Sequence, residues 1–166
     1  EIGKPVISAV NGVAAGAGAN IALACDIVVA KESASFIQAF SKIGLIPDSG
    51  GTFFLPRIIG FQKALALMMT GEKSSAREAE KMNMIYKAVP DEEFEATIQK
   101  LSTTLAKMPT KGLGLTKKAV NQSFSNSLHE QLELEQRFQT EAGKTHDCEE
   151  GVNAFLDKRK PEFTGK

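Results

Sequence analysis

Two short segments hold residues whose types and spacing could do chemistry. The first, Gly16-Ala17-Gly18, opens an alanine-rich stretch that favours a helix. The first N–H groups of a helix have no acceptor within it, and the helix dipole is positive at this end. The N–H of Ala17 could therefore donate to a developing oxyanion. The same small residues would also let a helix pack closely on a sheet, and spacing alone does not decide between the two interpretations.

The second segment, Gly44 to Gly51, places one carboxylate, Asp48, in a glycine-rich loop. Its apolar neighbours in the sequence are Leu45, Ile46, Phe53 and Phe54. Burial among them would raise the pKa of Asp48 toward the range useful to a general base. Alternatively, Asp48 or Ser49 is the N-cap of a helix that opens at Gly50, which would favour the charged form.

Other chemistries have weaker support. Gly16-x-Gly18 resembles part of a dinucleotide-binding turn, but Ile21 stands where a third small residue is needed. Cys25 and Cys148 are far apart and form no CxxC pair, so we expect no metal site. Two cysteines without such spacing are typical of a reducing compartment, and we expect the protein to be cytoplasmic.

The elements that must position these segments begin with a β-branched run. A strand is predicted at about 6–10, ended by the turn Asn11-Gly12, then a helix over about 16–25 and a strand over 26–30. Strand, helix and buried strand in this order predict a parallel crossover.

The rest of the chain reads as a shaped loop followed by helices. Glycine and proline punctuate residues 42–60, and helical patterns cover 61–69, 75–82 and 91–108. One face of the last pattern carries Phe94, Ile98, Leu101 and Leu105. Two or three more helices follow residue 113, with an apolar stripe of Leu128, Leu132, Phe138 and Ala142. The fold class is therefore α/β leading into a helical region.

Composition excludes several classes of partner. The 20 basic and 20 acidic residues balance, and no basic cluster could hold a phosphate backbone, so we expect no nucleic-acid partner. No apolar run reaches the roughly 18–20 residues that span a bilayer, so we expect no membrane partner.

Several motifs in order resemble the crotonase (enoyl-CoA hydratase/isomerase) superfamily. They are residues 4–12, Gly16-Ala17-Gly18, Cys25-Asp26-Ile27, residues 44–51 and residues 150–155. The resemblance implies a spiral of ββα turns, with residues 1–90 as the C-terminal part of that core and 91–166 as a helical oligomerisation region. It also implies an acyl-CoA thioester as substrate, no separate cofactor, and a homotrimer or hexamer.

The resemblance also assigns roles to residues. Ala17 matches the second of two N–H donors to the thioester oxygen, and Asp48 matches a catalytic aspartate of isomerases. The sequence around Asp48 is most similar to the ring-1,2-epoxyphenylacetyl-CoA isomerases of phenylacetate degradation. The residues that the resemblance implies to be substrate-binding are Gly16, Gly18, Asn20, Phe40, Pro47 and Gly50. Phe155 and Lys158 match positions that can touch the adenine end of coenzyme A bound to a neighbouring subunit.

Two departures from the hydratase pattern narrow the chemistry. Asn20 and Phe40 stand where hydratases have the two glutamates that activate water, which disfavours simple hydration. A Δ3,Δ2-enoyl-CoA isomerase or an unconventional hydratase of fatty-acid metabolism stays open as an alternative. The family places its first oxyanion donor upstream of Lys4, so we expect a C-terminal portion that is inactive alone. An oligomerising fragment without catalysis is the remaining alternative.

Overall fold

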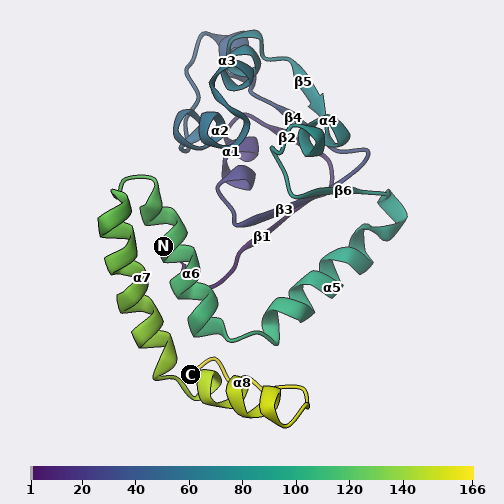
Figure 1. Ribbon diagram of the computed structural model, residues 1–166. Coiled ribbons are helices and arrows are strands. Elements are labelled where there is room, and N and C mark those ends of the chain that lie inside the picture. The colour runs from purple at the N-terminus through teal and green to yellow at the C-terminus, as the bar shows by residue number, and fades with distance from the viewer. Residues whose placement is uncertain (1) are drawn as a thin grey trace. The chain divides into compact units, whose positions relative to one another are not determined.

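Residues 2–166 are described by a computed structural model, and they divide into two units (Figure 1). The first, here called the sheet unit, is Val6–Lys100. The second, the helical unit, combines Leu101–Lys166 with the N-terminal segment that ends at Pro5. The segments expected to carry chemistry in residues 16–51 therefore lie in the sheet unit.

The central sheet of the sheet unit is parallel. Its strand order is β1-β3-β6, from β1 (Ile7–Val10), β3 (Ile27–Lys31) and β6 (Lys87–Val89). Strand β1 pairs with β3 in the register Ile7 to Ile27, which confirms the predicted strands and their parallel crossover. Val29 and Ala30 in β3 are completely buried, as expected for a short apolar run in a covered sheet.

A second three-stranded sheet was not predicted. It has the order β2-β4-β5, from β2 (Val13–Ala15), β4 (Ser35–Ile37) and β5 (Lys73–Ser75). The β2-β4 pair is parallel and the β4-β5 pair is antiparallel. Three residues are too few to show an alternating pattern, so only pairing with distant segments makes these residues strands.

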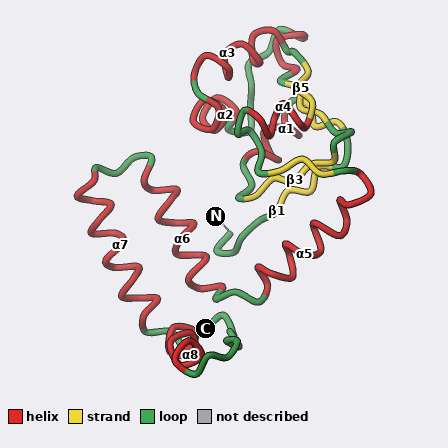
Figure 2. Tube along the Cα trace, turned by 45° about the vertical axis from the view of Figure 1, so that its right-hand side comes forward, coloured by secondary structure: helices red, strands yellow, loops and turns green. Residues whose placement is uncertain are grey.

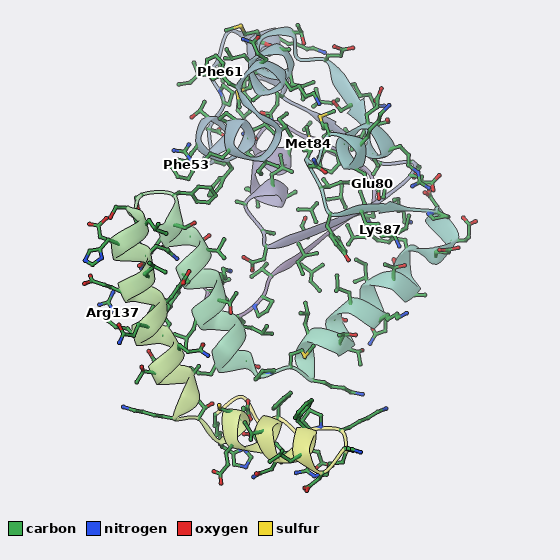
Figure 3. All side chains as sticks on the ribbon, in the orientation of Figure 1. Phe53, Phe61, Glu80, Met84, Lys87 and Arg137 are labelled. Atoms are coloured by element: carbon green, nitrogen blue, oxygen red, sulfur yellow. The ribbon has the colours of Figure 1, made fainter. Side chains whose placement is uncertain are left out.

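The helices that precede β6 lie on one side of the β1-β3-β6 sheet in Figures 1 and 2. They are α1 (Ala17–Leu23), the 3-10 helix η1 (Ala39–Ile43), α2 (Gly51–Ile59), α3 (Phe61–Thr70) and α4 (Ala76–Lys81). Helix α4 begins with a capping box, in which the Ser75 hydroxyl accepts from the N–H of Glu78. The core beneath the helices includes Leu23, Leu55, Met68 and Met84, and Figure 3 shows Met84 inside this unit.

The long helix predicted from residue 91 begins with a 3-10 turn, η2 (Asp91–Glu93), and continues as α5 (Phe94–Ala106). Phe94 is buried, and Ile98, Leu101 and Leu105 are half-buried. The predicted apolar face is therefore confirmed. The division between the two units falls within α5.

Three helices make up most of the helical unit: α6 (Thr110–Ser123), α7 (Leu128–Gly143) and α8 (His146–Leu156). Helices α6 and α7 lie side by side in both views (Figures 1 and 2). Ser127 caps α7 with a capping box to Glu130, and the Thr145 hydroxyl caps α8. The predicted stripe on α7 is wrong in part, because Leu134 is the buried leucine and Leu128 and Leu132 are exposed.

The last residues fold back along α8. The carboxylate of Asp147 accepts hydrogen bonds from the N–H groups of Thr164 and Gly165, at 2.7 and 2.8 Å. Glu150 binds Arg159 through two hydrogen bonds and accepts a third from the N–H of Glu162. No helix within residues 2–166 has both the length and the apolar character needed to cross a membrane.

Candidate functional site

Helix α1 starts at a glycine that the backbone requires. Gly16 is the N-cap, has a φ of 53°, and donates its N–H to the carbonyl of Ile37 at 2.9 Å. A Cβ built on Gly16 would lie 3.6 Å from the ring of Phe40, so that buried ring closes one side of the helix start. Ala17 is the first residue of α1, where an N–H has no acceptor within the helix. The geometry permits the predicted donor role of Ala17.

The carboxylate of Asp48 does not cap a helix. Helix α2 has Gly50 as its N-cap, with a φ of 78° and no side-chain hydrogen bond to the helix start. The alternative in which Asp48 or Ser49 caps this helix is therefore wrong. The Ser49 hydroxyl instead donates to Oδ1 of Asp48 at 3.0 Å, which orients the carboxylate.

Asp48 is exposed, and the predicted apolar enclosure is absent from the described residues. Leu45 and Ile46 are 60% and 81% exposed, and Phe53 projects from α2 with 45% of its surface exposed (Figure 3). The predicted desolvation of Asp48 is therefore wrong for residues 2–166. These apolar side chains instead remain exposed at positions close to Asp48 along the chain.

The main chain of Asp48 is held much more firmly than its side chain. Its carbonyl accepts two hydrogen bonds of 2.9 Å, one from Nδ2 of Asn20 and one from the N–H of Gly51. Asn20 is 1% exposed, and its Oδ1 accepts from Nε2 of Gln38 at 2.8 Å. These bonds join helix α1, the residue after β4 and the Asp48 loop.

The structure places Asn20 against the Asp48 loop and Phe40 against Gly16. The predicted site residues in the sheet unit lie on α1, on η1 or on the loop before α2: Gly16, Ala17, Gly18, Asn20, Phe40, Pro47, Asp48 and Gly50. Phe155 and Lys158 belong to the helical unit, at the end of α8 and just after it. Phe155 is 82% exposed, which leaves its ring available to a partner or ligand.

Two residues at the site are not predicted from the sequence. For Gln38, an amide between Phe36 and Phe40 in an apolar run is a usable signal of a buried polar contact. For Gly51, the sequence indicates only a glycine-rich loop. A Cβ built on Gly51 would lie 2.7 Å from Oδ1 of Asn20 and closer still to Nδ2, so the Asn20 amide fits only against glycine.

A metal does not fit this site. Within residues 2–166, no three His, Cys, Asp or Glu side chains are grouped so that they could ligate an ion. The Cys25 thiol donates to the carbonyl of Ile21 at 3.5 Å, and Cys148 is exposed. The polar groups of the site are backbone N–H groups, two amides and one carboxylate, which suit a neutral or anionic organic ligand.

Comparison with known proteins decides the family. The family model described as "Enoyl-CoA hydratase/isomerase" matches residues 1–166. The chain belongs to this family. The predicted crotonase fold is confirmed as well, because an enoyl-CoA hydratase structure from Bacillus anthracis superposes with a TM-score of 0.96 at 34% identity. That match covers 100% of this chain and 64% of the hydratase chain.

Relatives in the enoyl-CoA hydratase/isomerase family carry two kinds of name. A 1,2-epoxyphenylacetyl-CoA isomerase from Escherichia coli is 53% identical over 166 residues, which cover 100% of this chain and 63% of the relative. A probable enoyl-CoA hydratase from Rhodobacter capsulatus is 50% identical over 162 residues, covering 98% and 63%. The chain thus spans about 63% of the length of these two relatives.

The two positions compared with hydratase glutamates have no acid in this family member. Asn20 uses both ends of its amide in hydrogen bonds to Asp48 and Gln38, and the Phe40 ring lies against Gly16. Neither an amide nor a phenyl ring exchanges protons as a carboxylic acid does. Asp48 is therefore the carboxylate that this site presents beside the start of α2.

Proposed function

We propose that this chain is part of an acyl-CoA isomerase in which Asp48 is the acid and base. The proposal rests on the contrast between the main chain and the side chain of Asp48. Its carbonyl is fixed by two hydrogen bonds, while its carboxylate is exposed and is not used as a helix cap. A proton-transfer group needs this combination of a fixed backbone and an accessible side chain.

The N–H of Ala17 would donate to the thioester oxygen of the substrate. Polarising that carbonyl makes a proton on a nearby carbon more acidic, because the charge left behind spreads onto the oxygen as an enolate. The Asp48 carboxylate takes this proton and returns it to a different carbon, so the double bond moves and no atom is gained or lost. One well-placed donor of this kind contributes about 2.7–4 kcal/mol in comparable acyl chemistry.

The exposed side chains around Asp48 support an acyl substrate. Ile43, Leu45, Ile46 and Phe53 offer apolar surface close to the carboxylate along the chain. Among acyl groups we favour a ring epoxide, since the relative from Escherichia coli is named a 1,2-epoxyphenylacetyl-CoA isomerase. Coenzyme A is part of the substrate in this proposal, and no separate cofactor is needed. Phenylacetate catabolism is the corresponding process.

A chain alkene is the second candidate substrate, as in a Δ3,Δ2-enoyl-CoA isomerase of fatty-acid metabolism. Asp48 chemistry would serve both substrates, because each forms an enolate at the same carbon. Hydration is the third candidate and draws support from relatives named enoyl-CoA hydratases. The absence of a carboxylic acid at Asn20 and Phe40 argues against it.

The proposed enzyme is an assembly in which one subunit contacts the substrate of its neighbour. We propose a homotrimer or hexamer built through the helical unit, with Phe155 and Lys158 of one subunit touching the adenine end of coenzyme A held by another. A groove of about 980 Å³ between α6 and α7 is lined by apolar residues such as Leu113, Leu132 and Phe138, which suits helix-mediated assembly.

Proton exchange at the carbon next to the thioester tests the proposal. The full-length protein that carries this chain and its Asp48→Asn variant would be incubated in deuterated water with a 3-enoyl-CoA and, separately, with the ring epoxide of phenylacetyl-CoA. We expect the variant to lose exchange by at least about 100-fold, because the amide cannot accept the proton. Exchange that survives the substitution removes Asp48 from the mechanism, and hydration as the sole outcome contradicts an isomerase.

A further inference from the structure

A short chain of buried amides ends on the backbone of Asp48. From its far end, Nε2 of Gln38 donates to Oδ1 of Asn20, and Nδ2 of Asn20 donates to the carbonyl of Asp48. Gln38 and Asn20 are 4% and 1% exposed. We infer that Gln38 is a positioning residue for Asp48, acting through Asn20. This inference rests on the proposed role of Asp48 as acid and base.

The direction of this amide chain is set by the Asp48 carbonyl. A carbonyl only accepts, so Asn20 must present Nδ2 to it and turn Oδ1 toward Gln38. Gln38 must then present Nε2, which leaves its own Oε1 without a hydrogen-bond partner among the described residues. Turning either amide over would place two oxygens against each other. A buried unpaired acceptor is unfavourable, so the arrangement is kept because it orients the Asp48 carbonyl.

The backbone that follows Asp48 shows why such a restraint is needed. Ser49 has a φ of 49° and Gly50 a φ of 78°, so two consecutive residues adopt the left-handed conformation. Ser49 has a side chain, and this conformation is unfavourable for it. Such conformations persist where surrounding contacts hold them. The Asp48 carbonyl belongs to the peptide unit that enters Ser49, so the bond from Asn20 holds that unit in place.

Gly51 closes the arrangement from the opposite side. Its N–H donates to the same Asp48 carbonyl, and its missing Cβ leaves room for the Asn20 amide. The amide plane of Asn20 is thereby confined between Gln38 and Gly51. A change at Gln38 should reach Asp48 although its side chain makes no described hydrogen bond to that residue.

The test compares Gln38→Met with Ser35→Ala in the protein that carries this chain. Methionine has a similar length and cannot donate to Asn20. Ser35, three residues before Gln38, also has a buried oxygen without a partner among the described residues and serves as the matched control. For Gln38→Met we expect kcat for proton exchange to fall about 10- to 100-fold with KM changed less than about 2-fold, because a misplaced base loses rate without losing binding. Ser35→Ala should leave both values unchanged.

A second measurement reads the arrangement without catalysis. Hydrogen exchange of the Gly51 amide should become at least about 10-fold faster in Gln38→Met and stay unchanged in Ser35→Ala, because this amide shares the Asp48 carbonyl with Asn20. Asn20→Asp removes the donor itself and should behave as Gln38→Met does. If Gln38 acts only through Asn20, the double variant loses no more kcat than Asn20→Asp alone.

These measurements distinguish the positioning role of Gln38 from the role of Asp48 as the base. Unchanged Gly51 exchange in Gln38→Met, or kcat losses that multiply in the double variant, would overturn the positioning role. Faster Gly51 exchange together with an active Asp48→Asn variant would support the link from Gln38 through Asn20 to the Asp48 carbonyl. It would refute the role of Asp48 as the base. If Gln38→Met does not fold, the same readouts on Asn20→Asp decide the question.

Discussion

Replacing Gly51 with alanine sets two opposing effects against each other. Gly51 is the first residue of α2 and has no left-handed backbone, so helix propensity alone would favour alanine by roughly 0.5–1 kcal/mol. The added Cβ, however, would overlap the Asn20 amide, 2.7 Å from Oδ1 and closer to Nδ2. Asn20 cannot stay in place beside that atom.

The magnitude follows from what Asn20 must give up. If its side chain rotates away, it loses the hydrogen bonds to Asp48 and Gln38, each contributing about 1 kcal/mol. If it stays, overpacking costs roughly 1–3 kcal/mol. In either case the loss exceeds the gain from helix propensity, and we expect Gly51→Ala to lower the free energy of unfolding by about 1–2 kcal/mol.

Urea denaturation followed by circular dichroism measures this change. With an m-value of about 2 kcal/mol/M, the midpoint should fall by roughly 0.5–1 M. Gly18→Ala is the matched control, since Gly18 also lies in the first turn of a helix and a Cβ there meets nothing within 4 Å. The control should be neutral or slightly more stable. A Gly51→Ala variant as stable as the control would show that Asn20 is not confined as argued.

Two further predictions concern the tail folded along α8. Asp147→Asn should free the tail, because the NH₂ group of the new amide would face the N–H of Thr164 or Gly165. Each lost charge-assisted bond costs roughly 1.5–3 kcal/mol. Hydrogen exchange of the Thr164 and Gly165 amides should therefore accelerate at least about 10-fold. Unchanged exchange there would contradict the role of Asp147. The hydrogen bonds from Arg159, and then from the N–H of Glu162, lower the pKa of Glu150 to about 2 from its ordinary 4.5. Because the folded pKa is the lower one, the stabilising effect is complete above pH 4.5 and disappears as the pH falls toward about 2. The difference in urea midpoint between the protein and Glu150→Gln should therefore shrink over that interval, and a constant difference would count against the assignment.

Local signals predicted the elements that depend on neighbouring residues. The β-branched run at Ile27-Val28-Val29 became a buried strand, and the 3.6-residue spacing from Phe94 placed the inner face of α5 correctly. The parallel pairing of β1 with β3 followed from the order of strand, helix and strand. Strands β2, β4, β5 and β6 were not predicted, because three residues carry no period and their partners are distant in the sequence.

The sequence by itself determined which chemical groups the site could contain: an N–H at a helix start, one carboxylate at position 48, and no acid at Asn20 or Phe40. The tertiary structure decided how those groups are held. It showed Asp48 exposed and not used as a cap, and it connected Gln38, Asn20 and Gly51 to the Asp48 carbonyl. The reason is physical, since exposure and hydrogen bonding depend on which distant segments meet, and residue types along the chain do not specify those meetings.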